Sequence, residues 1–160
     1  MLDLWEQLQG IFLGNPEDTP EIIITNLTDE QTAECIRVLI TRARECSTQF
    51  FLGGTQYSVI VASLEVALEL LQLRKISAAF WLSLPILPQL GVFVERPGTI
   101  VLSYERDKWT AMSLIALFDL LDALIAVAPN AKLRLDDIYY SADERTLFAR
   151  VWQAYQNVAS

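Results

Sequence analysis

The chain has 160 residues, of which 52% are hydrophobic and 20% charged, with no histidine and two cysteines. This length fits one compact domain that can fold without a disulfide or a metal, and the high apolar fraction excludes intrinsic disorder. The formal net charge of −8 argues against a protein that binds nucleic acid by neutralising its phosphates.

The negative charge is concentrated at the start of the chain. Residues 1–34 contain eight of the 20 acidic residues and no Lys or Arg, so the rest of the chain holds 12 acids and all 12 bases. Acids at helix N-termini and in a loop would explain this excess, because the helix dipole favours anions there. The alternative interpretation is an acidic docking surface for a basic partner.

Residues 1–14 predict a short amphipathic helix. Asp3 and Glu6 have the spacing of a capping box. The apolar side chains recur at helical spacing, namely Leu4, Trp5, Leu8, Ile11 and Phe12. A linker over residues 15–20 separates this helix from the body, residues 21–160. Because a single short helix is marginal in water, we expect these five side chains to dock on the body of the chain or on a partner.

The body begins with a strand and a helix. The β-branched run at residues 22–24 indicates a strand, and a capping box at Thr28 predicts a helix over residues 29–46. That helix would carry both cysteines, Cys35 and Cys46, about 16 Å apart, which is too far for a disulfide. Two reduced thiols are typical of a cytoplasmic protein.

Five further segments follow this helix. Residues 49–52 form either a strand or a loop, and helical spacing predicts a helix over residues 55–75. The apolar runs at residues 79–84, 91–96 and 99–105 each indicate a strand. These strands are expected to form a small antiparallel sheet.

The last two of these strands are joined at Pro97 and Gly98, which suggests a two-residue turn. In that register Val94 faces Val101, and Phe93 would lie opposite Leu102 on the other face. Both faces of the sheet would then be partly apolar. Helices on both faces, or a second protomer on one of them, are therefore expected to cover the sheet.

The C-terminal part predicts a long apolar helix over residues 107–128, a short strand over residues 133–135, and a helix that a capping box opens at Ser141. A membrane span can be considered only within the apolar helix, where Asp119 and Asp122 would each cost about 3 kcal/mol on insertion. We therefore expect a buried helix. With no basic export signal at the start of the chain, we expect a cytoplasmic protein.

These elements predict a single α+β domain with a small antiparallel sheet of about three to five strands packed by helices, in the order α-β-α-α-βββ-α-β-α. From Thr55 onward the order α-βββ-α-β-α is similar to that of small acidic secretion-chaperone-like and YbjN-like domains. This similarity covers about two thirds of the chain and rests on topology, without a residue motif. It implies a dimeric binding protein.

The residues that could carry chemistry are few. Without histidine the chain lacks the commonest general base and the usual zinc ligand, so the sequence predicts no catalytic residue and no cofactor. Asp119 and Asp122 lie on one helical face, and Asp136 could approach them to form a hard-cation site. The alternative is that these aspartates are solvated.

Three functions remain open. The first is a non-enzymatic protein-interaction or adaptor domain, or a chaperone-like domain, acting as a homodimer through its apolar surface. The second is a small-ligand-binding regulatory domain with a pocket between sheet and helices, lined by Trp81, Tyr104, Trp109 and Tyr139. The third is a carboxylate-dependent metal enzyme at Asp119, Asp122 and Asp136.

Overall fold

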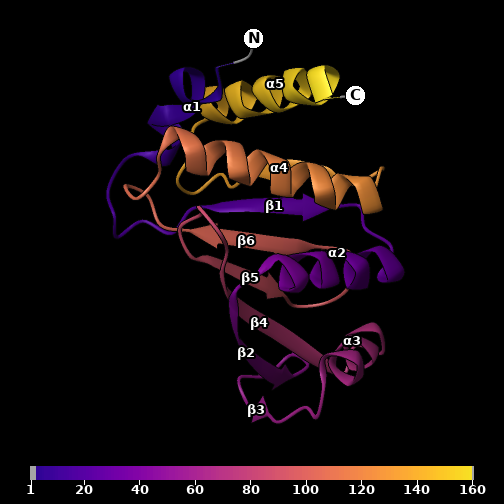
Figure 1. Ribbon diagram of the computed structural model, residues 1–160. Helices are drawn as coiled ribbons and strands as arrows, with labels where there is room; N and C mark the ends of the chain where they lie inside the picture. Colours follow the sequence, from indigo (N-terminus) through magenta and orange to yellow (C-terminus); the bar gives the residue numbers. More distant parts are fainter. Residues whose placement is uncertain (1–2, 160) are drawn as a thin grey trace.

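The computed structural model describes residues 3–159 (Figure 1). Its helices are α1 (Leu4–Phe12), α2 (Asp29–Arg42), α3 (Leu64–Gln72), α4 (Ala111–Val127) and α5 (Ala142–Ala159). Its strands are β1 (Glu21–Thr25), β2 (Glu45–Leu52), β3 (Ser58–Val59), β4 (Ile76–Ser83), β5 (Leu90–Val94), β6 (Ile100–Tyr104) and β7 (Lys132–Leu135). The α+β class predicted from the sequence is confirmed.

The sheet is larger than predicted. It has seven strands in the order β3-β2-β4-β5-β6-β1-β7, and every neighbouring pair is antiparallel. The prediction of three to five strands is therefore wrong. It missed β3, which has only two residues, and β2, whose first five residues are polar or small and exposed. An edge strand of this kind lacks the apolar alternation by which a strand is recognised.

The two elements on either side of β2 are shorter than predicted. Helix α2 ends at Arg42, and Cys46 lies on β2, exposed, whereas Cys35 is buried on α2. The expectation that one helix carries both cysteines is therefore wrong. The helix predicted from residue 55 begins only at Leu64, where the Ser63 hydroxyl caps it.

The turn between β5 and β6 differs from the predicted hairpin by one residue. Phe93 pairs with Val101 and Val92 with Leu102, so the connection is the five-residue loop 95–99. Gly98 in this loop has a φ of 110°, and its N–H donates to the Thr32 hydroxyl at 3.0 Å. Since a slip of one residue exchanges the faces of a strand, Phe93 moves to the face opposite the one predicted.

Helices cover one face of the sheet only. α2 and α4 pack against each other, α1 and α5 stack beyond α4, and α3 lies against β4 (Figure 1). The strand residues beneath the helices are buried, as the alternating burial along β1, β4 and β6 shows. Coverage of both faces by helices is therefore not found. We call the other side the open face; it carries Glu21, Ile23, Thr25, Ser77, Ala79, Trp81, Gly91, Phe93, Val101 and Ser103.

Helix α1 packs against α4 and α5 of its own chain. Four of the five side chains predicted to dock, Leu4, Leu8, Ile11 and Phe12, are buried, and Trp5 is partly buried. The first two residues of the predicted range 1–14 lie outside the described residues. These apolar side chains are thus part of the core of their own chain.

The end of α1 is held by a hydrogen-bonded tyrosine pair. The Tyr140 hydroxyl donates to the carbonyl of Ile11 at 2.9 Å. The Tyr104 hydroxyl lies 2.6 Å from the Tyr140 hydroxyl, and because the Tyr140 proton is already used, Tyr104 is the donor of this second bond. Burial raises the pKa of Tyr140 to about 12, so this hydroxyl keeps its proton at neutral pH. Arg106 adds an ion pair with Asp18 of the linker at 3.4 Å.

Helix α4 begins at a capping box formed by Thr110 and Ser113, a few residues after the predicted start. Its buried residues lie against β-sheet and helices, as expected for the apolar run. Within residues 3–159, no helix is long and apolar enough to cross a membrane.

Candidate functional site

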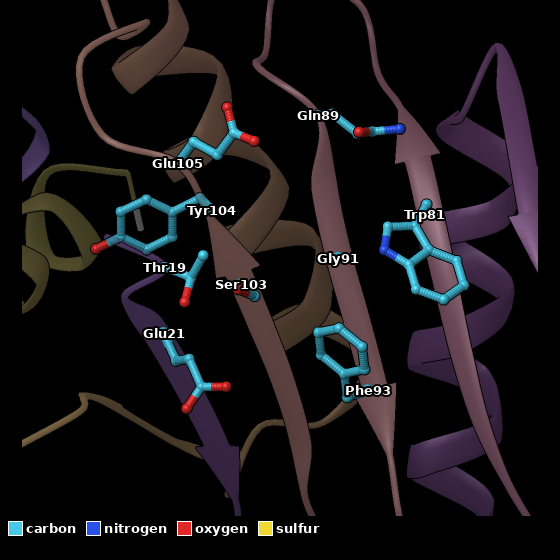
Figure 2. Close-up of a pocket in the computed structure, with 9 residues that line it drawn as sticks. All are labelled: Thr19, Glu21, Trp81, Gln89, Gly91, Phe93, Ser103, Tyr104 and Glu105. Atoms are coloured by element: carbon cyan, nitrogen blue, oxygen red, sulfur yellow. The ribbon is translucent and has the colours of Figure 1, made fainter. Parts of the chain in front are cut away.

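The open face contains a hollow that the strand register creates. One cross-strand row runs from Glu21 on β1 through Ser103 and Gly91 to Trp81 on β4. Two small residues thus lie between two large ones, which leaves a depression of about 440 Å³ (Figure 2). It is lined by Thr19, Glu21, Trp81, Gln89, Gly91, Phe93, Ser103, Tyr104 and Glu105, and we call it the Glu21–Trp81 hollow.

Two aromatic side chains, Trp81 and Phe93, line one side of this hollow. Trp81 and Phe93 meet edge to face with ring centroids 6.1 Å apart. A Cβ at position 91 would lie 3.0 Å from Cε2 of Phe93, so the ring rests directly over Gly91. With Val101 and Ile23 of the next row, these side chains form an apolar band across the open face.

The opposite wall is a carboxylate without a partner. Within residues 3–159, Glu21 has neither an ion pair nor a side-chain hydrogen bond, although it is only partly exposed. Burial, and then the nearby Asp136 carboxylate, raise the pKa of Glu21 above its ordinary value. Glu105 also lines the hollow and pairs with Lys108 at 3.1 Å, and no Lys or Arg is among the lining residues. The side chains that line the hollow therefore carry a net negative charge.

The same hollow holds a hydrogen-bond donor that lacks an acceptor. The indole nitrogen of Trp81 faces the side of Gly91 (Figure 2), and in the described part of the chain its N–H donates to no other group. The Ser103 hydroxyl and the Gln89 amide lie on the lining as well. The hollow thus combines an unpaired acceptor, an unpaired donor and an aromatic wall.

A second depression lies on the other side of Phe93. It measures about 290 Å³ and is lined by Glu21, Phe93, Glu95, Arg96, Thr99 and Val101. Glu21 and Phe93 border both depressions, so the two depressions lie side by side on the open face.

The pocket predicted between sheet and helices is not formed as one site. Trp81 lies on the open face, whereas Trp109 is buried on the helical side, where its indole N–H donates to the Glu105 carbonyl at 2.8 Å. Tyr104 borders the hollow, but its side chain is 2% exposed and its ring stacks on Phe12. Tyr139 lies on the exposed segment before α5. Trp81 and Tyr104 therefore border one hollow, whereas Trp109 lies on the helical side of the sheet.

The three candidate metal ligands do not come together in one site. Asp119 pairs with Arg42 at 3.0 Å on the exposed side of α4. Asp136 is buried and accepts backbone N–H groups from Glu21, Ile138 and Tyr139 at 2.7, 2.9 and 2.8 Å. Within the described residues, no three or more His, Cys, Asp or Glu side chains lie close enough together to hold a metal ion, and this includes Asp122.

Sequence reasoning missed Glu21, Gly91, Phe93 and Ser103. Alternation along β6 pointed to the right faces, because Ser103 and Val101 alternate with buried Leu102. The signal for Phe93 lay in the register, which depends on the loop length. A five-residue loop would have aligned Phe93 with Val101 and Gly91 with Ser103.

Comparison with known proteins gives no relative: no family model, no curated protein and no solved structure matches this chain. The functional conclusion therefore rests on the geometry of the chain itself.

Proposed function

We propose that this chain is a non-enzymatic protein-interaction domain, of the adaptor or chaperone-like kind, that binds its partner on the open face of the sheet. The observation that carries the proposal is the uncovered central sheet with its apolar band and hollow. Phe93 is 36% exposed at the middle of this face, where aromatic side chains are the usual anchors of an interface.

The shape of the site favours a protein over a small ligand. Pockets for small molecules enclose most of the ligand surface, whereas the Glu21–Trp81 hollow is an open depression on the face of the sheet, with the second depression beside it. A partner that crosses several strands can contact both. The two free thiols support a cytoplasmic setting for this partner.

A photo-crosslinking amino acid placed at position 93 is expected to capture a partner from a lysate of the source cells in a single specific band. The control carries it at Val158, which is 75% exposed near the C-terminal end of α5, on the helical side of the sheet. Substitution of Val101 by aspartate in the position-93 protein should abolish that band, because a charge on the apolar band opposes docking. Equal capture at both positions, or capture that survives V101D, would contradict the proposal.

We also propose that the chain is a homodimer joined at the free edge of β2. Residues 45–49 pair with β4 on one side, but β3 pairs only with Phe50 and Phe51 on the other. This edge has neither a proline nor a lysine to block pairing. Antiparallel pairing with the same strand of a second copy would extend the sheet across a two-fold axis.

A proline at position 48 is expected to convert the dimer to a monomer. The Leu52 N–H points away from β4, to the Tyr57 carbonyl at 2.9 Å, so alternation also directs the Thr48 N–H outward. T48P therefore removes an outward donor without breaking the ladder to β4, and T48V keeps that donor. Light scattering should find wild type and T48V dimeric and T48P monomeric. A monomeric wild type at millimolar concentration would refute the dimer.

A further inference from the structure

We propose that the Glu21–Trp81 hollow holds a Lys or Arg side chain from an extended segment of a basic partner protein. This inference rests on the proposed function and names the chemistry that the open face recognises. It is argued from the charge, the aromatic wall and the unpaired donor of the hollow.

The charge of the hollow selects a cation. Among the described residues Glu21 has no ion-pair partner and is partly buried, and no basic side chain lines the hollow. Glu105 lines the same hollow, although it pairs with Lys108. A cation placed against Glu21 would gain a charge-assisted hydrogen bond that the chain itself does not supply. A second copy of the chain would instead bring its own Glu21 to this face. The net charge of −8 also attracts a basic partner from a distance.

The aromatic side chains suit the aliphatic part of such a residue. Lys and Arg carry apolar stems that pack on aromatic surfaces while the charged head stays at a polar rim. Trp81 and Phe93 offer this surface, and Gly91 and Ser103 leave room above the floor. The stem would pack against the exposed surfaces of the two rings and pass over Ser103, with its head at Glu21.

The unpaired indole donor indicates a peptide. The Trp81 N–H has no acceptor among the described residues, and the carbonyl of an extended main chain can accept from it beside a basic side chain. A polyamine carries no acceptor, and a free amino acid would bring its own carboxylate next to Glu21. The second depression, beyond Phe93, gives the neighbouring residue of the segment a place to lie.

The test uses the full chain labelled with ¹⁵N and short capped peptides of alternating Thr and Val with a central Lys, Arg, norleucine or Glu. We expect the Lys and Arg peptides to shift the Trp81 indole signal and the Gly91 and Ser103 amide signals in a saturable way. The norleucine and Glu peptides should bind at least about tenfold more weakly, since a charge-assisted hydrogen bond is worth roughly 1.5–3 kcal/mol. The indole signal is assigned with W81F.

Two variants locate the contact. E21Q should weaken binding of the Lys peptide about tenfold, whereas E69Q, which removes the same charge from an exposed position on α3, should leave it within about twofold. G91A fills the floor under Phe93 and should block binding by all peptides. The spectrum of each variant shows whether it is folded.

Acidification provides an independent readout. As the pH is lowered, protonation of Glu21 should weaken binding of the Lys peptide. Because burial raises the pKa of Glu21, this loss of affinity should begin at a higher pH than the ordinary glutamate pKa of 4.5 would give. E21Q should remove this pH dependence. A pH-independent affinity in the wild type would contradict a contact with Glu21.

Three outcomes would overturn the inference. Equal binding of the norleucine peptide would refute the choice of a cation, and equal binding of spermidine with the same Trp81 shift would refute the choice of a peptide. An unchanged affinity in E21Q would refute the site. If these peptides fail while crosslinking at position 93 still captures a partner, the proposed function stands and only this ligand chemistry is wrong.

Discussion

Replacing Phe12 with alanine is expected to lower the free energy of unfolding by about 3–5 kcal/mol. The Phe12 side chain is fully buried, and its ring centroid lies 5.3 Å from that of Tyr104 and 4.8 Å from that of Trp109. Truncation would remove both contacts and leave a cavity at the place where the end of α1 meets the body. It would also loosen the helix that the Tyr140 hydroxyl holds.

Urea denaturation followed by tryptophan fluorescence measures this loss. The control is L13A at the next position, which is 36% exposed and should change stability by less than about 0.5 kcal/mol. A loss below about 1 kcal/mol in F12A would mean that α1 does not dock on its own chain. The apolar face of α1 would then again be a candidate surface for a partner.

Asparagine at position 136 is expected to cost about 2–4 kcal/mol. One Asp136 oxygen accepts the N–H groups of Ile138 and Tyr139, and the other accepts the N–H of Glu21. An asparagine keeps only one acceptor oxygen, so its amide would face at least one of these donors. Because the site is buried, the donor left without an acceptor bears its full desolvation cost.

The matched control for D136N is D137N, an exposed neighbour whose substitution should be nearly neutral. Both are compared by urea denaturation with and without Mg²⁺. If the losses are equal, Asp136 does not act as a backbone clamp. If Mg²⁺ stabilises the wild type and not D136N, the metal-site hypothesis returns.

The hydrogen bonds of Asp136 also position Glu21 on the open face. Its hydrogen bond of 2.7 Å to the Glu21 N–H, together with the Asp136 N–H bond to the Glu21 carbonyl at 3.0 Å, fixes the start of β1. The Glu21 side chain is thereby held at the wall of the hollow. Asp136 is therefore a positioning residue for the proposed site, and D136N should also weaken peptide binding.

Local signals in the sequence were sufficient for most helices. The capping box at Thr28 is confirmed. The Thr28 hydroxyl accepts a hydrogen bond from the Gln31 N–H, and the side-chain oxygen of Gln31 accepts one from the Thr28 N–H, both at 3.0 Å. The Ser141 and Glu144 pair forms in the same way at the start of α5. Asp3 caps α1 as predicted. These contacts span three residues, so a single sequence contains both partners and their spacing.

The strands on either side of the helices were less accessible to such reasoning. β2 was divided between a predicted helix and a segment, residues 49–52, predicted as either a strand or a loop. Its residues 45–49 are polar or small, and only pairing with β4 makes them a strand. The acidic excess of residues 1–34 shows the same limit. Asp29 pairs with Arg74 and Asp18 with Arg106, whereas Glu21 forms no ion pair within residues 3–159. No local pattern distinguishes these three acids.

By itself, then, the sequence determined the α+β class, the caps of α1, α2 and α5, and the absence of histidine chemistry. Only the tertiary structure decided the register of β5 and β6. Two hydrogen bonds of Gly98 help to fix it: the Gly98 N–H donates to the Thr32 hydroxyl, and the Gly98 carbonyl accepts from the Leu27 N–H. That register places Phe93 and Gly91 beside Ser103 and makes the hollow. The physical reason is that strand side chains alternate with a period of two, so one residue of loop length, set by contacts far along the chain, exchanges the covered and open faces.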